Sequence, residues 1–104
     1  MEAMVKLNVK TLNTLTQKTV GLIGANPVYP VYFTTRWGIH TFGMKSPIDV
    51  VILDDDNRVV KLTRSLAPNR IFFWNPTYYR VLELPPGTIS EKKIHIGTPI
   101  AIEE

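Results

Sequence analysis

The sequence predicts a mainly β or α+β domain, in which short antiparallel strands form a small curled sheet or barrel with one or two short helices. Short runs of β-branched and aromatic residues recur along the chain, and turn residues separate them at short intervals. The 8 prolines also limit the length of any helix or strand. A chain of 104 residues suits one hydrophobic core, so residues 1–104 are expected to form a single domain.

Composition excludes several classes of protein. The hydrophobic fraction of 44% and the charged fraction of 20% are those of an ordinary globular domain. The absence of cysteine excludes disulfides, cysteine nucleophiles and cysteine metal sites. No apolar segment approaches the roughly 20 residues of a membrane span, and the first residues lack a signal-peptide core. We therefore expect a soluble, cytoplasmic protein with no membrane partner.

The first half of the chain predicts two strands and one short helix. Residues 4–9 alternate apolar and polar side chains, which is typical of a strand with one solvated face. The apolar residues of 11–23 fit neither the helical nor the strand period well, but Leu12 and Leu15 are three positions apart and one short helix is predicted here. After several turn residues, the β-branched and aromatic run at 31–35 predicts a second strand.

A β-hairpin is predicted at the centre. Residues 48–53 are almost all β-branched or aliphatic, which indicates a strand covered on both faces. Residues 54–58, an acidic cluster, have the composition of a tight turn, and the strand pattern resumes at 59–63. The acidic turn lacks the ligand spacing, glycine and closing glutamate of a calcium loop, so a structural turn is favoured by about nine to one.

The last third of the chain predicts further short elements. Thr88 or Ser90 is expected to cap a helical turn or two within residues 88–93. Strands are expected at 71–74, 78–84 and 99–102.

Asp49 is out of place in its strand. It alternates with Val51 and Leu53 on a mostly apolar face, where an unpaired carboxylate is costly. Lys45, four residues upstream, is the expected partner, followed by backbone amides near residues 42–44. Glu83, between two leucines, presents the same problem.

Three motifs resemble a known family. They are Phe42-x-Met44-Lys45, Pro47-Ile48-Asp49-Val50, and the distal Val81-Leu82-Glu83-Leu84-Pro85-Pro86-Gly87. In this order they resemble the family known as domain of unknown function 192 (uncharacterised protein family 0127), over roughly residues 5–102. Members of this family usually carry two or three more residues between the Lys and the Pro, so the short spacing of Lys45 and Pro47 departs from the family pattern. The resemblance implies a compact β-rich single domain and no established biochemical activity.

Five polar or flexible residues are predicted to line a candidate polar pocket. They are Met44, Lys45, Asp49, Glu83 and His40. The favoured interpretation is a binding or accessory module that takes an unknown small-molecule or polymer ligand, without a cofactor or a metal. The alternative is a hydrolytic enzyme with Asp49 and Glu83 as acid and base, and a structural role for both is favoured by about two to one. For His40 a structural role is favoured by about four to one.

A third interpretation is weak binding of single-stranded nucleic acid. Nine aromatic residues are interleaved with Arg36, Arg70 and Arg80, and stacking beside arginines is how small β domains hold single strands. The nine are Tyr29, Tyr32, Phe33, Trp37, Phe72, Phe73, Trp74, Tyr78 and Tyr79. Aromatic residues mostly fill cores, so exposure of a third of them on one face has a prior of about one in three. With a net charge of +3, any such binding is expected to be weak and salt-sensitive.

Overall fold

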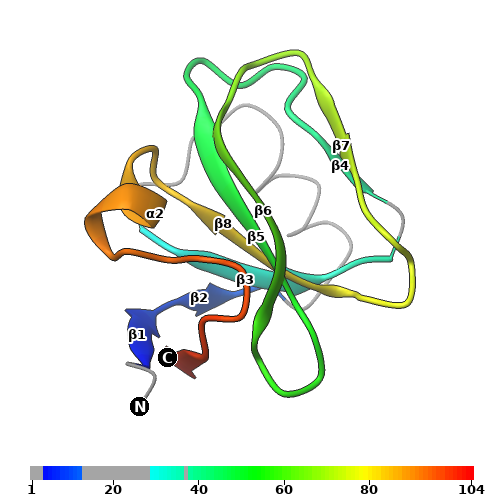
Figure 1. The fold of residues 1–104 in the computed structure, drawn as a ribbon. Helices are drawn as coiled ribbons and strands as arrows, with labels where there is room; N and C mark the ends of the chain where they lie inside the picture. Colours follow the sequence, from blue (N-terminus) through cyan, green and yellow to red (C-terminus); the bar gives the residue numbers. More distant parts are fainter. Residues whose placement is uncertain (1–3, 13–28, 37) are drawn as a thin grey trace.

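The computed structural model describes residues 4–12, 29–36 and 38–104. These residues form nine strands and one short helix (Figure 1). The bounds are β1 Val5–Asn8, β2 Lys10–Thr11, β3 Val31–Thr34, β4 Gly38–His40, β5 Ile48–Leu53, β6 Val59–Leu66, β7 Ile71–Phe73, β8 Arg80–Leu84, α2 Thr88–Glu91 and β9 Ile100–Glu103. The fold is therefore mainly β.

The strands form three sheets. A five-stranded sheet has the order β2-β3-β8-β5-β6, and β1–β9 and β4–β7 are separate pairs. Among the described residues none of the sheets closes into a barrel, so the predicted barrel form is not found. Most pairs are antiparallel as expected, but two differ, since β1 runs parallel to β9 and β2 runs parallel to β3.

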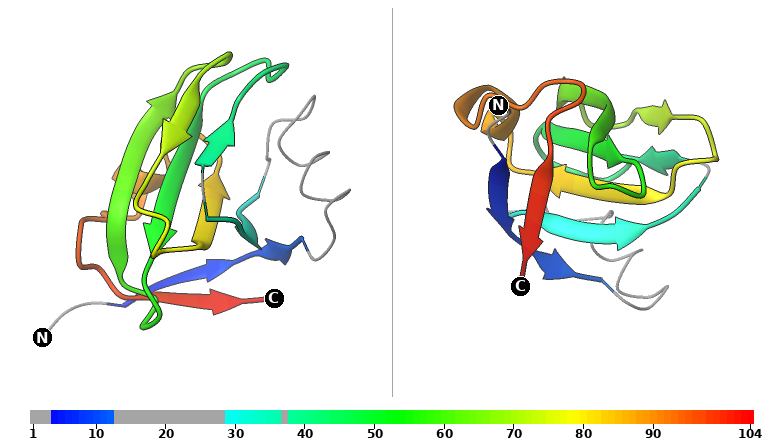
Figure 2. Two further views of the ribbon diagram at one scale, coloured as in Figure 1. Left: turned by 90° about the vertical axis from the view of Figure 1, so that its right-hand side faces the viewer. Right: turned by 60° about the horizontal axis from the view of Figure 1, so that its bottom comes forward.

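The five-stranded sheet lies between two hydrophobic cores. The first core lies beneath β1, β9 and α2, and the second lies beneath β4 and the end of β7 (Figure 2). The first core contains Leu7, Val9, Val51, Leu53, Val59, Leu82, Leu84, Ile89, Ile94 and Ile100. The second contains Leu12, Val31, Phe33, Ile39, Met44, Ile48, Val50, Ile52, Trp74 and Val81. Because both faces are covered, all six residues of β5 are buried.

The predicted hairpin is confirmed as β5–β6. The carboxylate of Asp54 accepts hydrogen bonds from the N–H groups of Asp56 and Arg58, both at 2.9 Å, which closes the turn. Near the other end of the hairpin, Ile48 pairs with Leu66 but Val50 pairs with Thr63. One residue of β5 therefore opposes two of β6, which is the geometry of a β-bulge.

The other predicted strands are found as β1, β3, β7, β8 and β9, while β2 and β4 were not predicted. The helical turn predicted at 88–93 is α2, but the predicted cap is wrong. Its N-cap is Gly87, and the Thr88 hydroxyl instead donates to the carbonyl of Pro85 at 2.7 Å. The helix predicted within 11–23 falls almost wholly outside the described residues. Within the described ranges, no helix is long and apolar enough to cross a membrane.

Candidate functional site

Asp49 is held by two backbone amides. Its Oδ1 accepts a hydrogen bond from the N–H of Ser65 and its Oδ2 accepts one from the N–H of Ile89, both at 2.9 Å. The side chain is 1% exposed. Hydrogen bonds to a charged acceptor are among the stronger ones in proteins. Asp49 therefore has the structural role that the sequence favoured.

The two donors belong to parts of the chain that need an acceptor. Ser65 lies in the bulge of β6 and has a φ of 51°, so its amide leaves the regular ladder. Ile89 is in the first turn of α2, where backbone N–H groups have no partner inside the helix. Gly87, the N-cap, has no side chain to supply one. Asp49 thus ties β5 to the bulge and to the helix at once.

The predicted partners of Asp49 are not the observed ones. Lys45 is exposed, and no ion pair joins it to Asp49 in the part of the chain that the structure describes. In the turn formed by residues 41–44, the N–H of Met44 donates to the carbonyl of Thr41 at 3.2 Å and not to Asp49. The acceptor was predicted, but its donors come from more distant segments.

Glu83 is buried, and no described residue donates to its carboxylate. It is 0% exposed, and neither carboxylate oxygen has a hydrogen-bond partner among residues 4–12, 29–36 and 38–104. It pairs with Val31 of β3 and with Val50 of β5, so all three side chains point to the second core. Burial raises the pKa of Glu83 from 4.5 to about 8, because the apolar surroundings disfavour the charged form. Glu83 is therefore mostly protonated and neutral at pH 7.

The two carboxylates do not share a cleft. Val50, and not Asp49, is the β5 residue opposite Glu83, and successive residues of a strand point to opposite faces. Asp49 faces the first core and Glu83 the second. Both are buried, and both oxygens of Asp49 are already bonded. The acid and base pair that the alternative hydrolase interpretation requires is therefore not assembled.

The remaining members of the predicted pocket are dispersed. Met44 is 5% exposed and belongs to the second core. His40 is half-buried; its Nδ1 accepts a hydrogen bond from the N–H of Phe42 at 3.3 Å, and its ring stacks on that of Phe42 with centroids 4.9 Å apart. The five predicted residues thus lie in the core, on the surface and on two faces of a sheet, and they do not line one polar pocket.

A buried threonine that was not among the predicted site residues holds the loops beside β4. The Thr41 hydroxyl donates to the carbonyl of Ala67 at 2.7 Å and accepts a hydrogen bond from the N–H of Arg70 at 2.9 Å. Its carbonyl also accepts from the N–H of Asn69 at 3.0 Å. Thr41 therefore fixes residues 41–44 against residues 67–70. A single threonine in a β-rich sequence gives no signal of this role.

The aromatic residues do not gather on one exposed face. Of the eight in the predicted set that the structure describes, only Tyr29 and Phe73 are exposed, at 45% and 64%. Tyr29 precedes β3 and Phe73 ends β7, in different sheets. Tyr79 has the guanidinium of Arg36 4.6 Å from its ring centroid and that of Arg80 at 5.8 Å. Of the aromatic residues and arginines predicted to bind nucleic acid, Tyr79, Arg36 and Arg80 therefore already contact one another.

A compact apolar surface lies instead on β4 and β7. Ile71 and Phe73 alternate with Phe72, so they point outward while Phe72 packs against the second core. His40 pairs with Ile71 and brings the stacked Phe42 to the same side. Phe42, Ile71 and Phe73 are 46%, 53% and 64% exposed. These three residues are called the β4–β7 apolar face below.

Phe73 lies on a glycine that leaves room for it. A Cβ at Gly38, its cross-strand partner, would lie 3.1 Å from Cδ1 of Phe73 and 2.8 Å from the carbonyl oxygen of Phe72. The backbone of β4 therefore supports the Phe73 ring from one side. An exposed ring that rests on backbone loses less side-chain freedom on binding than an unsupported one.

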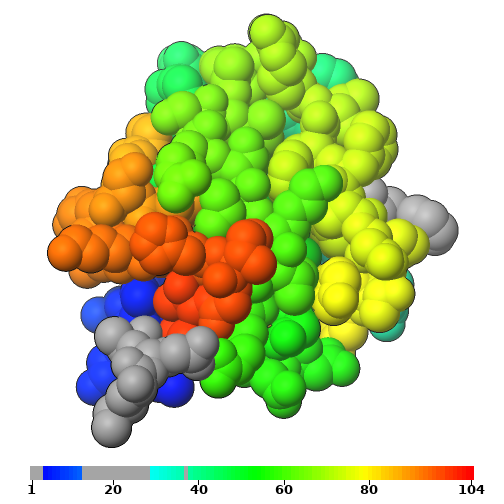
Figure 3. All heavy atoms as spheres, in the orientation of Figure 1, coloured from blue at the N-terminus to red at the C-terminus, as the bar shows by residue number. Residues whose placement is uncertain are grey.

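Three exposed cations are close to the β4–β7 apolar face in sequence or by contact. Lys45 follows Phe42 by three residues, Arg70 precedes Ile71, and Nζ of Lys61 donates to the carbonyl of Phe73 at 2.6 Å. The sequence has no Asp or Glu from position 3 to 48, from 50 to 53 or from 57 to 82. Residues 57–82 cover the centre and right of the surface in Figure 3.

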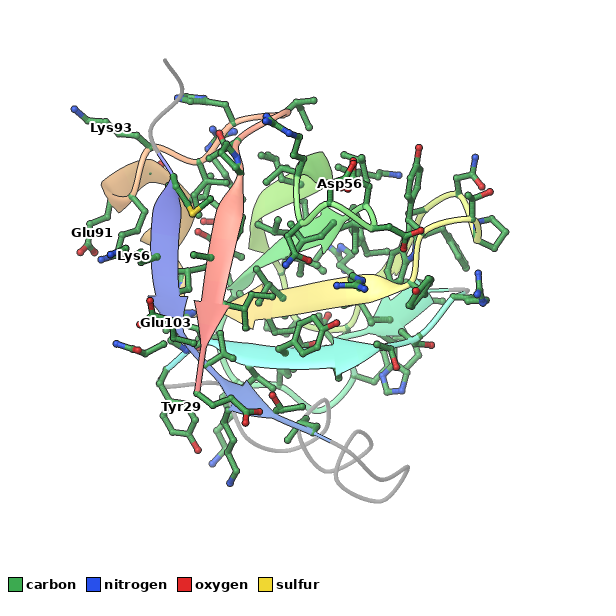
Figure 4. The ribbon with its side chains drawn as sticks, turned by 90° about the horizontal axis from the view of Figure 1, so that it is seen from below. Lys6, Tyr29, Asp56, Glu91, Lys93 and Glu103 are labelled. Atoms are coloured by element: carbon green, nitrogen blue, oxygen red, sulfur yellow. The ribbon has the colours of Figure 1, made fainter. Side chains whose placement is uncertain are left out.

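The opposite side of the domain mixes both signs of charge. Figure 4 shows charged side chains of both signs on and around β1, β9 and α2; those labelled are Lys6, Glu91, Lys93 and Glu103. The acidic turn, marked there by Asp56, lies at the tip of the β5–β6 hairpin. In the described part of the chain, no group of three histidine or acidic side chains could hold a metal ion.

Known structures share this fold. A protein of unknown function from Novosphingobium aromaticivorans superimposes with a TM-score of 0.73 at 16% identity, covering 86% of this chain and 70% of that one. A putative transcription regulator from Sinorhizobium meliloti gives a TM-score of 0.70 at 18% identity, covering 86% and 76%. At these identities the likeness concerns the fold alone.

A search of curated proteins found no match. The model of the family DUF192, described as an uncharacterized ACR, matches residues 2–102. Two of the motifs that carry the resemblance are neighbours in the fold, since Asp49 pairs with Leu84 and Val50 with Glu83. The chain therefore belongs to the DUF192 family.

Proposed function

We propose that this domain is a binding module and that its ligand docks on the β4–β7 apolar face. The observation that carries the proposal is the exposure of Ile71 and Phe73 on one face of β7, together with Phe42, which follows β4 and stacks on His40, the cross-strand partner of Ile71. Exposed apolar side chains that are scattered singly need no explanation, whereas contiguous ones rimmed by polar residues mark interaction sites. Aromatic side chains also dominate the energetics of binding surfaces.

Support comes from how firmly the face is built. Thr41 fastens the two loops that border it, and Gly38 and Phe72 form the backbone on which Phe73 rests. A preorganised surface loses little conformational entropy when it binds. Of the residues in the predicted polar pocket, His40 contributes here by stacking on Phe42.

The proposal predicts binding of a probe that is both apolar and anionic. We would titrate isotope-labelled protein with 1-anilinonaphthalene-8-sulfonate and follow the backbone amide resonances by NMR. The expected shifts gather in residues 38–43 and 70–73. Phe73→Ser should weaken binding by about tenfold, which is the loss expected for one well-placed aromatic contact.

Ile96 provides the matched control. It is 63% exposed, close to the 64% of Phe73, but it follows α2 on the other side of the domain. Ile96→Ser should leave the titration unchanged, and both variants should keep the wild-type melting temperature because neither side chain is in a core. Shifts that gather elsewhere, or equal weakening by both substitutions, would refute the proposal.

A further inference from the structure

We propose that the natural partner of the β4–β7 apolar face is an acidic polypeptide segment that carries apolar side chains, an inference that rests on the proposed function. The surface is apolar at Phe42, Ile71 and Phe73, and two exposed cations adjoin it: Arg70, which precedes Ile71, and Lys61, which donates to the carbonyl of Phe73. An apolar centre calls for apolar contacts, and a rim of one charge selects the opposite charge on the partner. Acidic peptides with apolar side chains and single-stranded nucleic acids meet these requirements to different extents.

The aromatic rings favour a polypeptide. A base binds by stacking on an open ring face, but one face of Phe42 is covered by His40 and Phe73 lies against the backbone at Gly38. Ile71, between them in the surface, offers no ring. A branched aliphatic side chain can fill the space among these three residues, whereas a base would stack on two partly covered rings. The apolar contact is therefore better suited to side chains than to bases.

The cations also favour a polypeptide. Lys61 already donates to the carbonyl of Phe73, with its ammonium 4.9 Å from the ring centroid of Phe72, and Arg36 donates to the carbonyl of Pro76. Lys45 and Arg70 remain as the rim cations closest in sequence to the exposed side chains. Nucleic-acid affinity comes mostly from the number of phosphates neutralised, and a few cations give weak binding. For a peptide, the same cations add only selectivity and rate to an apolar contact.

A second copy of this chain is a poor occupant. In a symmetric dimer the same patch meets itself, so the cationic rim of one protomer would face that of its partner. No acidic residue occurs within positions 57–82 to compensate for that repulsion. The charge pattern thus points to a different molecule, and to one with negative charge.

The test uses the full chain and two synthetic probes in fluorescence anisotropy. The first probe is a labelled extended peptide in which glutamate alternates with leucine, and the second is a labelled oligothymidylate of similar charge. The peptide should bind, and Phe73→Ser should weaken its binding about tenfold while Ile96→Ser does not. Arg70→Glu should also weaken binding of the peptide. Its effect should be larger in low salt than in about 0.15 M salt, where charges are screened beyond roughly 8 Å.

The outcomes separate the two proposals. Tighter binding of oligothymidylate than of the peptide in about 0.15 M salt would overturn the polypeptide inference. Equal binding of a control peptide in which lysine alternates with leucine would do the same, because charge would then not select the partner. If the sulfonate dye binds at residues 38–43 and 70–73 but the acidic peptide does not bind at all, the docking face stands and the partner class is wrong. If the dye does not bind there, the docking face itself is wrong.

Discussion

Asp49 and Glu83 are buried acids on neighbouring strands of one sheet, yet their surroundings are opposite. Asp49 faces the first core and receives one backbone N–H on each oxygen. Glu83 faces the second core and receives none from the part of the chain that the structure describes. The comparison shows that burial alone does not define the role of an acid. The available donors decide whether it fastens the fold or remains as an uncharged polar group.

The difference arises from the segments that lie next to each acid. The side of Asp49 is adjacent to a bulge and to the first turn of a helix, both of which present unpaired amides. On the side of Glu83 the cross-strand partners are Val31 and Val50, whose backbone groups belong to the sheet. Two chemically similar residues therefore make opposite contributions to stability.

The largest expected effect is that of removing the acceptor at position 49. Asp49→Ala leaves the amides of Ser65 and Ile89 without their partner, at about 1–3 kcal/mol for each buried donor. We expect a loss of about 2–6 kcal/mol in the free energy of unfolding, measured by urea denaturation. Asp49→Asn should lose less, because its amide oxygen still accepts one bond. Wild-type stability in Asp49→Ala would show that these bonds do not fasten the fold.

Glu83 should act on stability in the opposite direction and through pH. The folded protein holds the Glu83 proton up to about pH 8, whereas the unfolded chain releases it near pH 4.5. Between these values the folded state binds more protons, so stability falls as pH rises, by at most about 1.4 kcal/mol per pH unit. Below pH 4.5 both states are protonated and above about pH 8 both are ionised, so the contribution becomes constant.

Glu83→Gln isolates this contribution, because glutamine is neutral at every pH and occupies nearly the same volume. The stability of Glu83→Gln minus that of the wild type should increase from about pH 5 to about pH 8. Urea denaturation of both proteins across this range measures it, and the other acids cancel in the difference. A constant difference would mean that Glu83 is ionised in the folded protein and has a donor.

The sequence predicted the regular parts of the fold from side chains that act locally. The bounds of β5 match, because Ile48–Leu53 is apolar on both faces apart from Asp49, and the acidic turn that follows it ends the strand. The strands β2 and β4 escaped prediction because each is only two or three residues long and mostly polar or glycine, whereas the equally short β7 is wholly apolar. The parallel pairing of β1 with β9 joins the two ends of the chain, which no local pattern reveals.

The candidate site was less predictable because it depends on backbone N–H groups and on which side of β7 faces solvent. Asp49 could be identified as needing partners, but its donors are amides of Ser65 and Ile89, and every residue except proline has one. The run Ile71–Phe73 has the composition of a core strand, and alternation shows only that Ile71 and Phe73 share a side. Which side faces solvent depends on β4, which was not predicted.

The smallest expected effects on stability come from substituting two acids of the hairpin turn, which are not buried. Asp54 accepts two backbone N–H bonds, whereas Asp55 has an 81% exposed side chain whose oxygen lies 4.0 Å from Nε of Arg80. Asp54→Ala should therefore cost about 1 kcal/mol, as for loss of a cap, while Asp55→Asn should change stability by less than about 0.5 kcal/mol. Thermal melts of the two variants at one pH measure the contrast, with a decrease of about 4–8 °C expected for Asp54→Ala alone. Equal melting temperatures would show that donors to the carboxylate do not decide the role of an acid on the surface, and would restrict that rule to the buried pair Asp49 and Glu83.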